Sequence, residues 1–307
     1  MEAYDIIIVG GGPIGASTAY FLSQTDSSKK IALITDDPEG DRSVTYRYAG
    51  GSISWYWADP LRTEMTTVTA NFIKRLIRNK KVDLGALEHN YHALYQGTFT
   101  PSLNIRSAAL VQYFLSEAEK SITVQRNSRL SNIEKLPKGG FVLTAGGKSY
   151  KTKRLLLALG VHNEDFIPDI KIVHNKRQIF VTDLPVDASR EKMPHTIVPI
   201  GKGYGYVFIK KFPNGLKVVV GQEDVFDHSD ETKAIDYYDK LMETTLGEVM
   251  PWLKDAKVTD ILWAIDVEGK LLQLYDDGNG LLAANCGSAV RSCVWIGKEL
   301  SKKLSSA

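Results

Sequence analysis

The chain has few cysteines, no long apolar run near its start and no excess of charge of one sign. Neither of its two cysteines, Cys286 and Cys293, belongs to a C-x-x-C pair or to a cysteine–histidine cluster with metal-ligand spacing. The sequence therefore predicts no metal site and favours reduced thiols in a cytoplasmic protein. The apolar run over residues 6–9 is too short to span a membrane and lacks the features of a signal peptide.

The charge balance also argues against some classes of partner. The 38 basic and 36 acidic residues give a net charge of +2 and are spread along the chain, so composition indicates neither nucleic-acid nor membrane binding. The basic cluster at residues 74–81 is interpreted as the solvated face of a helix. With 43% hydrophobic residues, 307 residues suffice for one large domain or two interleaved domains.

The first fifteen residues predict a strand joined to a helix by a glycine-rich loop. Residues 4–9 have the pattern of a parallel strand buried on both faces, and they lead into the loop GGGPIG at residues 10–15. In such a loop Gly10 permits the tight turn, Gly12 lets the backbone approach a pyrophosphate, and Gly15 lets the helix pack on the sheet. The pattern predicts a dinucleotide-binding site at the helix N-terminus.

An acidic residue follows the second predicted strand, residues 31–35. Asp36 stands about 20 residues after Gly15, where a carboxylate accepts hydrogen bonds from a ribose hydroxyl in dinucleotide-binding folds. Asp37 and Thr35 are alternatives for this contact, and we prefer Asp36 because the strand alternation ends there. The fingerprint by itself leaves open whether NAD(P) or FAD is bound.

Further elements follow in both halves of the chain. Residues 45–53 predict a loop of small residues, and helices are expected over 62–78 and 106–120. Short strands are expected at 123–124, 131–134 and 140–144, and a buried strand over 154–160. Alternating strands at 177–183, 206–210 and 216–221 predict an antiparallel sheet with a helix over 232–245. A strand at 280–287 then ends in a glycine turn and a helix over 292–304.

These patterns predict an α/β fold with two interleaved domains. A Rossmann-type domain with a parallel sheet would comprise residues 1–60, 98–168 and 266–307. A smaller α+β substrate domain, built on the antiparallel sheet, would comprise residues 61–97 and 169–265. The C-terminal strand, turn and helix would return to complete the nucleotide site.

The order of motifs resembles the D-amino-acid oxidase, glycine oxidase and sarcosine oxidase family of FAD-dependent oxidoreductases. The resemblance covers nearly the whole chain and rests on residues 7–15 (IIVGGGPIG), 49–51 (AGG), 156–160 (LLALG) and 280–287 (GLLAANCG) with the helix that follows. It implies a flavoprotein enzyme that oxidises the C–N bond of an amino acid or secondary amine, of the sarcosine, glycine or D-amino-acid type, by hydride transfer to flavin N5. FAD would be bound non-covalently, with Cys286 as a small packed residue.

The resemblance also implies which residues contact FAD. The loop 49–51 should approach the isoalloxazine, Leu130 should contact adenine through its backbone, and the last glycine turn should lie near the flavin ring, where the dipole of the closing helix favours negative charge. The residues expected at the cofactor are Gly10, Gly12, Pro13, Ile14, Gly15, Asp36, Asp37, Ser43, Thr45, Arg47, Gly50, Gly51, Leu130, Ala158, Gly160, Gly287, Ser288, Ala289, Val290 and Arg291.

The substrate needs a cation for its carboxylate and a pocket that holds the amine over the flavin. Arg291 follows the last glycine turn, where relatives of the sarcosine oxidase type carry a basic residue that binds carboxylate; the alternative is a structural arginine at a helix start. Trp55, Tyr204, Tyr206 and Trp263 are candidates for the pocket wall, with core packing as the alternative.

Two departures from the resemblance leave the substrate open. Relatives usually run longer, which implies a shortened substrate domain, and residues 263–272 lack the arginine and Thr-Pro-Asp-Gly pattern common before the final strand. One alternative is therefore a flavin-binding subunit of a multi-subunit amine or amino-acid dehydrogenase. Another is an NAD(P)-dependent dehydrogenase, which the strand at 156–160 and the C-terminal glycine turn disfavour. The electron acceptor would be oxygen or a protein partner, and both homo- and hetero-oligomers remain open.

Overall fold

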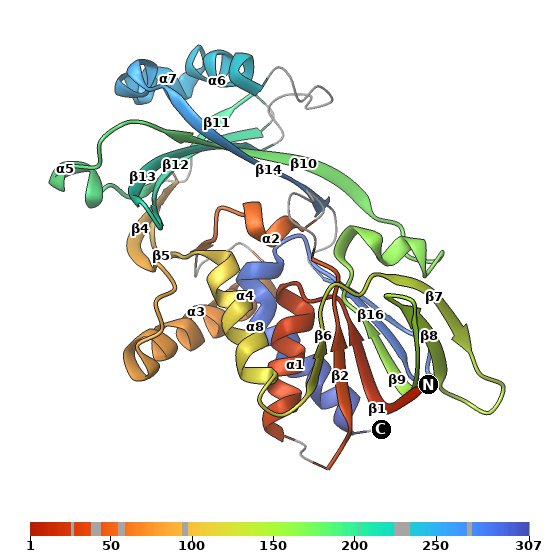
Figure 1. Ribbon diagram of the computed structural model, residues 1–307. Coiled ribbons are helices and arrows are strands. Elements are labelled where there is room, and N and C mark those ends of the chain that lie inside the picture. Colours follow the sequence, from red (N-terminus) through yellow and green to blue (C-terminus); the bar gives the residue numbers. More distant parts are fainter. Residues whose placement is uncertain are drawn as a thin grey trace.

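The computed structural model describes residues 1–25, 28–37, 44–54, 59–93, 98–201, 203–223, 234–268 and 272–306. These residues build two sheets of eight strands each. In Figure 1 one sheet arches over the ends of the other sheet's strands and over the helices packed beside them. The fold is thus α/β, with a mainly parallel sheet and a separate mainly antiparallel sheet, as the sequence predicts.

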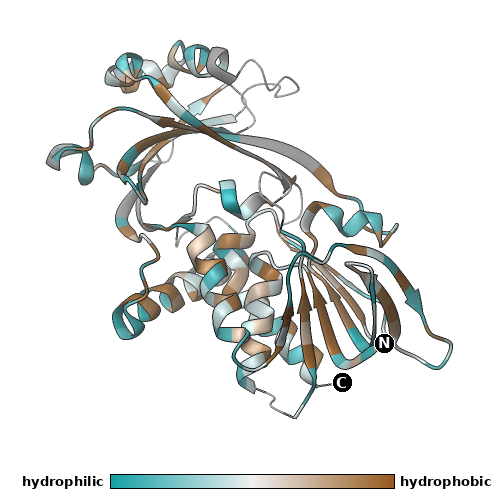
Figure 2. Cartoon of the chain, viewed as in Figure 1, coloured by the Kyte–Doolittle hydropathy of each residue, from teal (hydrophilic) through white to brown (hydrophobic). Residues whose placement is uncertain are grey.

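The first sheet contains five parallel strands that lie next to one another. In order these are β16 (Leu281–Asn285), β9 (Lys148–Leu157), β1 (Glu2–Val9), β2 (Ile31–Ile34) and β6 (Thr123–Gln125). Strand β15 (Gln273–Asp276) adds an antiparallel edge, and the hairpin of β7 (Leu130–Lys135) and β8 (Phe141–Ala145) pairs with β9. Ile6, Ile7 and Ile8 have no exposed surface because β1 is covered on both faces. Figure 2 shows the apolar residues running along these strands.

Four helices pack together beside this sheet: α1 (Pro13–Thr25), α3 (Pro60–Lys80), α4 (Ser107–Ala118) and α8 (Ala289–Ser305). Helix α3 begins with Asp59 capping the backbone N–H of Arg62 and Pro60 in the first turn, and it ends at Lys81 in the left-handed conformation. Helices α1 and α8 pack tightly where Ser17 faces Gly297, and Ser17 Oγ donates to the Cys293 carbonyl at 2.8 Å.

The second sheet has the order β14 (Val258–Glu268), β10 (Val173–Thr182), β13 (Gly215–Glu223), β12 (Gly203–Phe212), β11 (His195–Ile200), β4 (Leu87–Ala93), β5 (Thr98–Asn104) and β3 (Ser52–Ser54). Neighbours are antiparallel except β11 and β4. One face forms a core with α6 (Ala234–Met242), α7 (Thr245–Val249) and the 3-10 turn η3 (Pro251–Asp255). The opposite face carries Ile179, Phe208 and Val219.

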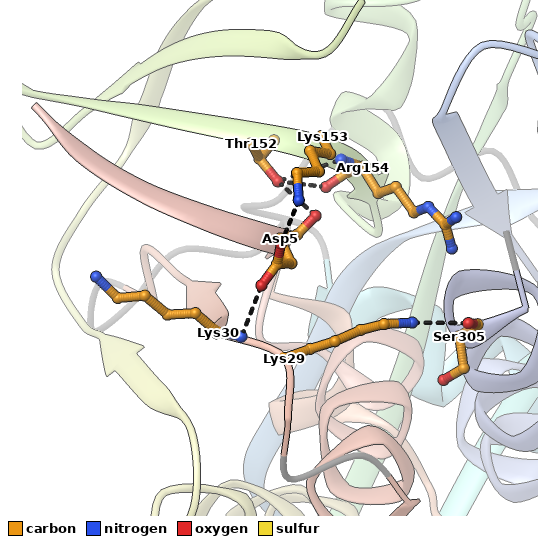
Figure 3. A network of polar contacts seen from close by, with 7 residues as sticks. All are labelled: Asp5, Lys29, Lys30, Thr152, Lys153, Arg154 and Ser305. Atoms are coloured by element: carbon orange, nitrogen blue, oxygen red, sulfur yellow. Dashed lines mark hydrogen bonds and ion pairs between the residues drawn. The ribbon is translucent and has the colours of Figure 1, made fainter.

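A polar network ties elements together at the amino end of β1 (Figure 3). The Asp5 carboxylate accepts hydrogen bonds from Lys153 Nζ at 2.8 Å and from the Lys30 backbone N–H at 3.0 Å. The bond from Lys153 is the main reason why the pKa of Asp5 lies below its usual value. Nearby, Lys29 Nζ donates to the Ser305 carbonyl at 2.7 Å, which anchors the end of α8. These contacts lie away from the loop that follows β1.

Some local expectations are wrong. Residues 45–53, expected as a loop, contain the short helix α2 (Thr45–Tyr48) and the start of β3. The strand expected to reach Gly160 ends at Leu157, because Gly160 adopts φ +60° and begins the 3-10 turn η1 (Gly160–Asp165). The closing helix begins at Ala289 rather than at 292. Strands β4, β5, β11, β14 and β15, and the short helix α5 (Ala188–Glu191), were not anticipated.

The predicted domain limits remain a proposal. Strands β3 and β5 pair in the second sheet although they fall within segments assigned to the nucleotide domain. Helix α3, assigned to the substrate domain, packs against α8. Within the described residues, no helix combines the length and the apolar character that a membrane span requires.

Candidate functional site

A cavity of about 520 Å³ lies where the two sheets approach each other. Its walls include the loop after β1, the ends of β2, β9 and β16, the N-terminus of α8, and one face of the second sheet. A cavity of this size is within the range of small-molecule sites. Two helix N-termini, those of α1 and α8, border it, so both contribute backbone N–H groups and positive dipole ends.

The glycines after β1 differ in what surrounds them. Gly10 has φ +107°, and a Cβ there would lie 2.3 Å from the Ala158 carbonyl oxygen. A Cβ on Gly15 would lie 1.9 Å from the Gly10 carbonyl oxygen, so both residues must be glycine for the fold. A Cβ on Gly12 would meet no protein atom within 4 Å, although Gly12 lines the cavity. The open space at Gly12 fits a ligand that lies against the backbone.

The three candidates for the ribose contact have different surroundings. Thr35 Oγ1 accepts a hydrogen bond from the Gly11 N–H at 2.9 Å and supports the loop. Asp37 Oδ2 accepts from the Tyr46 hydroxyl at 2.6 Å and pairs with Arg47 at 2.8 Å. Its Oδ1 is buried and has no hydrogen-bond partner among the described residues. Asp36 is exposed and lines the cavity, as Asp37 does.

The Asp37 cluster shifts the titration of its neighbours. Burial is the main reason why the pKa of Tyr46 is strongly raised, and the hydrogen bond to Asp37 adds to the effect. The Asp37 carboxylate also raises the pKa of Arg47. Arg47 is therefore held by Asp37 and does not line the cavity.

At the ends of β9 and β16, two buried amides shape the wall. Asn163 Oδ1 accepts from the Leu159 N–H at 3.1 Å, and Asn163 Nδ2 donates to the Ala284 carbonyl at 3.1 Å. Asn285 lines the cavity beside Asn163. Cys286 lines the cavity as well, and its side chain is buried.

The second sheet supplies an aromatic wall. Tyr206 and Phe208 of β12 are stacked with ring centroids 6.0 Å apart, and both line the cavity. The Tyr206 ring lies over Gly221 of β13, where a Cβ would come within 2.5 Å of three of its atoms. Gly221 thus lets this ring lie flat on the sheet.

Ser52, which follows the glycine pair at residues 50–51, contacts two side chains of the wall. Its Oγ and His195 Nδ1 lie 2.8 Å apart and share a hydrogen bond. Its carbonyl oxygen accepts from Arg291 Nε at 2.7 Å. His195 is 4% exposed, Arg291 is partly buried, and both line the cavity together with Ser52.

A buried lysine lies behind the same loop. Lys210 Nζ donates to the Ala49 carbonyl at 2.8 Å, and burial lowers the pKa of Lys210 to about 8. A Cβ on Gly50 would lie 3.2 Å from both Ile179 and Phe208, so the loop rests directly on the second sheet.

The structure brings most of the predicted site residues to this cavity. Those that line it are Gly10, Gly12, Pro13, Ile14, Asp36, Asp37, Gly50, Gly51, Leu130, Ala158, Gly160, Tyr204, Tyr206, Gly287, Ser288, Ala289, Val290 and Arg291. Gly15, Arg47 and Trp263 are described but do not line it. The backbone of Thr45 belongs to α2, whereas Ser43 and Trp55 lie outside the described residues.

The sequence reasoning missed His195, Ser52 and Asn285, which line the cavity, and also Lys210 and Gly221, which support the Ala49 loop and the Tyr206 ring from behind. Gly221 carried a usable signal, since a glycine inside a strand indicates close approach of another group. His195 and Ser52 are 143 residues apart, so only the fold reveals their pairing. Among the described residues, no group of three histidine, cysteine, aspartate or glutamate side chains could hold a metal ion.

Comparisons with known proteins agree with this geometry. The family described as "FAD dependent oxidoreductase" matches residues 5–87 and 74–265. The FAD-dependent oxidoreductase domain-containing protein 1 of Xenopus laevis is 33% identical over 78 residues, which are 24% of this chain and 15% of that protein. The match thus spans under one sixth of that relative's length.

Solved structures match over almost the full chain. Iminodiacetate oxidase from Chelativorans sp. BNC1 has a TM-score of 0.74 at 16% identity, covering 96% of this chain and 94% of its own. Glycine oxidase from Geobacillus kaustophilus has a TM-score of 0.73 at 13% identity, and the match covers 100% of this chain and 96% of that one. L-proline dehydrogenase from P. horikoshii has a TM-score of 0.75 at 12% identity, and the match covers 99% of this chain and 94% of that one. At these identities the likeness concerns the fold.

Proposed function

This chain belongs to the family of FAD-dependent oxidoreductases, and on that premise we propose that it oxidises the C–N bond of an amino acid or a secondary amine. One observation carries the proposal: a single cavity joins the glycine loop and two helix N-termini, one of which carries Arg291, to the aromatic face of the second sheet. Sarcosine, glycine, proline and D-amino acids are the substrate types that we would test first.

The residues of the cavity fit FAD. The open space at Gly12 and the N-terminus of α1 suit a pyrophosphate, and the unpartnered Asp37 Oδ1 suits a ribose hydroxyl, with Asp36 as the other candidate. Leu130, Ala158 and Gly160 would complete the cofactor wall. The N-terminus of α8 would favour negative charge at the flavin ring.

We propose that FAD is held without a covalent bond. Cys286 is the one cysteine that lines the cavity in the described part of the chain, and it is 4% exposed. Its Sγ also accepts from the Ser288 N–H at 3.4 Å, so the thiol has a packing role at the turn before α8. Denaturing the protein with acid should therefore release all of the flavin into the supernatant, and Cys286→Ala should keep the yellow colour.

FAD, when bound, would supply the two-electron acceptor for the reaction, and the protein would orient the substrate. Arg291 would bind the substrate carboxylate; its bond to the Ser52 carbonyl fixes the plane of the guanidinium. Tyr204, Tyr206 and Phe208 would wall the pocket and exclude water from the reacting C–H bond. Trp55, which lies outside the described residues, remains a candidate for the same wall.

The electron acceptor would be oxygen or a protein partner, and two buried cysteines that are not joined in a disulfide suit a cytoplasmic location. The test is the visible spectrum of the purified protein, recorded again without oxygen while sarcosine, glycine, proline or D-amino acids are added. Loss of the flavin band with one compound would establish the activity and its substrate class. A yellow protein that no amine bleaches would support a flavin-binding subunit instead, and a protein that takes up no FAD would overturn the proposal.

A further inference from the structure

A row of residues crosses the second sheet on the face that lines the cavity. Directly opposite one another on four neighbouring strands stand Ile197 of β11, Tyr206 of β12, Gly221 of β13 and Ile179 of β10. Residues paired in this way point to the same face of a sheet. The two isoleucines and the tyrosine line the cavity. Gly221 is the one member of this row without a side chain, so the sheet has room there for a neighbouring group.

The Tyr206 ring occupies this room. A Cβ on Gly221 would lie 2.1 Å from Tyr206 Cε2, 2.2 Å from Cζ and 2.5 Å from the hydroxyl oxygen. Atoms in ordinary contact lie about 3.5–4.0 Å apart, so a side chain at this position would displace the ring by at least about 1 Å. The backbone of the sheet lies beneath the ring, and the rings of Phe208 and His195 lie beside it, with centroids 6.0 and 5.9 Å away. The displaced ring would therefore enter the cavity.

This face of the cavity offers a substrate apolar surface without formal charge. The second sheet also contributes Phe208, Ala264 and Val267 to the lining. Of the described residues that line the cavity from this sheet, none is aspartate, glutamate, lysine or arginine. Charged lining residues such as Asp165 and Arg62 come from other elements. A charged substituent would lose its water against this face without gaining an ionic partner there, whereas an apolar substituent gains free energy by leaving water.

We propose that Gly221 is a positioning residue that determines specificity: it lets the Tyr206 ring lie flat and so keeps the cavity open for a substrate with a large, uncharged, apolar substituent beside its amine. This inference rests on the proposed function and names its substrate class, amines and amino acids of the leucine or phenylalanine type. Gly221 acts through Tyr206, which lines the cavity whereas Gly221 does not. With a side chain beneath it, the raised ring would fill the space that the substituent needs.

The test uses the protein with FAD bound and two amino acids that cannot be oxidised, because their Cα carries no hydrogen. In 2-aminoisobutyrate the Cα carries two methyl groups, and in α-methylphenylalanine a benzyl group replaces one of them. The dissociation constant of each ligand is measured by calorimetry, with both enantiomers of α-methylphenylalanine. The ratio of the two constants reports on the apolar substituent alone, because the ligands share every other group.

Three variants accompany the wild type. Gly221→Ala should displace the Tyr206 ring into the cavity. Its matched control is Gly205→Ala on β12, where a Cβ would lie 2.5 Å from Ile200 Cδ1 in the core on the opposite face of the sheet. Gly221→Ala is also combined with Tyr206→Ala, which removes the ring that the new methyl group would meet, and is compared with Tyr206→Ala alone. The FAD content and thermal unfolding of each variant are compared with those of the wild type.

We expect the wild type to bind α-methylphenylalanine at least about tenfold more tightly than 2-aminoisobutyrate, since even one methylene in an apolar pocket changes recognition by about 10- to 200-fold. Gly221→Ala should reduce this ratio to about threefold or less by weakening the binding of the larger ligand. Gly205→Ala should keep the ratio within about twofold of the wild type, even if it lowers stability. In the Tyr206→Ala background, Gly221→Ala should change the ratio by less than about twofold.

The ligand ratios also define what would overturn the inference. A wild-type ratio near one would do so without any variant, so the inference stays testable even if Gly221→Ala fails to fold. A ratio that Gly221→Ala leaves unchanged would overturn it as well. An effect of Gly221→Ala that persists without the Tyr206 ring would show that the ring is not the cause.

Flavin bleaching separates this inference from the proposed function. One enantiomer of leucine or phenylalanine should bleach the wild type faster than glycine or sarcosine, and at least about 100-fold faster than glutamate or lysine. If glycine or sarcosine bleaches the flavin as fast as the larger amino acids, the inference is wrong and the proposed function stands. If no amine or amino acid bleaches the wild type, the proposed function itself fails, and the inference fails with it.

Discussion

At the scale of single residues, Gly12 differs from the other glycines of its loop. A Cβ there meets no protein atom within 4 Å, whereas a Cβ on Gly15 lies 1.9 Å from a backbone oxygen. Gly12→Ala should therefore leave the thermal stability of the FAD-free protein unchanged, but it should weaken FAD binding by at least about tenfold, because the methyl group occupies the cofactor's space.

Gly15→Ala is the matched control, since it should lower the stability of the FAD-free protein as well. Thermal melting followed by circular dichroism, with FAD titrations followed by flavin fluorescence, separates the two effects. Normal FAD affinity in Gly12→Ala would mean that the loop does not hold the pyrophosphate.

Lys210 gives a second test at this scale. Burial lowers its pKa from 10.5 to about 8 in the folded protein. Below pH 8 the Lys210 side chain is protonated in both the folded and the unfolded protein, and burial of its ammonium lowers the free energy of unfolding. This loss of stability disappears as the pH rises toward 10.5. The shift corresponds to about 3 kcal/mol. Lys210→Met should therefore have a higher free energy of unfolding than the wild type at pH 7. Loss of the hydrogen bond to the Ala49 carbonyl should reduce this gain by about 1 kcal/mol.

That gain should shrink, and then reverse, between pH 8 and 10.5. Urea unfolding of FAD-free protein across this range measures the difference in free energy. The control is Lys211→Met, because the neighbouring Lys211 side chain is exposed to water. An equal pH trend in both variants would show that burial of Lys210 is not the cause.

At the scale of elements, the contact between α1 and α8 depends on Gly297. Glycine to alanine inside a helix usually stabilises by about 0.5–1 kcal/mol. Here a Cβ would lie 2.5 Å from Ser17 Oγ and 2.8 Å from the Ser17 backbone carbon, so Gly297→Ala should instead destabilise by about 1–3 kcal/mol. The free energy of unfolding is measured by chemical unfolding for Ser17→Gly, for Gly297→Ala and for the double variant. The difference between the double variant and the sum of the single variants gives the coupling energy between the two positions. A stabilised Gly297→Ala would contradict close packing of these helices.

Elements whose pattern is local could be predicted from the sequence. Strand β1, the glycine loop and α1 follow from an apolar run, three glycines and helical spacing within about 25 residues. Strand β4 (LEHNYHA) has no such pattern. Its place in the sheet comes from pairing with β5 and with β11, and β11 lies over 100 residues later in the sequence. Sequence spacing likewise misplaced the end of β9, where the positive φ of Gly160 turns the chain.

The same division applies to the candidate site. The wall that we propose for the cofactor could largely be predicted, because Gly10, Gly12 and Gly287 follow strand ends that meet at one edge of a parallel sheet. The opposite wall could not be predicted, because Ser52 contacts Arg291 and His195, which lie 239 and 143 residues away from it in the sequence. Those contacts depend on the register of β11 and on how the second sheet lies over the first. Arg291 was predicted through the resemblance, and its bond to Ser52 was not.

At the scale of the whole molecule, the cavity walls come from both sheets, so a bound cofactor would contact both at once. A ligand that binds only the folded state stabilises it by about 2.7 kcal/mol when its concentration is 100 times Kd. For a chain of 307 residues such a gain should raise the melting temperature by about 4 °C. The increase should grow with the logarithm of FAD concentration, because the linkage follows mass action.

The measurement is thermal melting at several FAD concentrations, with Gly12→Ala as the control that keeps the fold but should show a much smaller increase. AMP and riboflavin, which carry the two ends of FAD separately, sharpen the result. Each half should contact a smaller part of the walls and should raise the melting temperature less than FAD at the same concentration. In the proposed binding mode, only the intact dinucleotide would reach from Asp36 and Asp37 to the N-terminus of α8. A melting temperature that does not respond to FAD would mean that the cavity between the sheets is not where the cofactor binds.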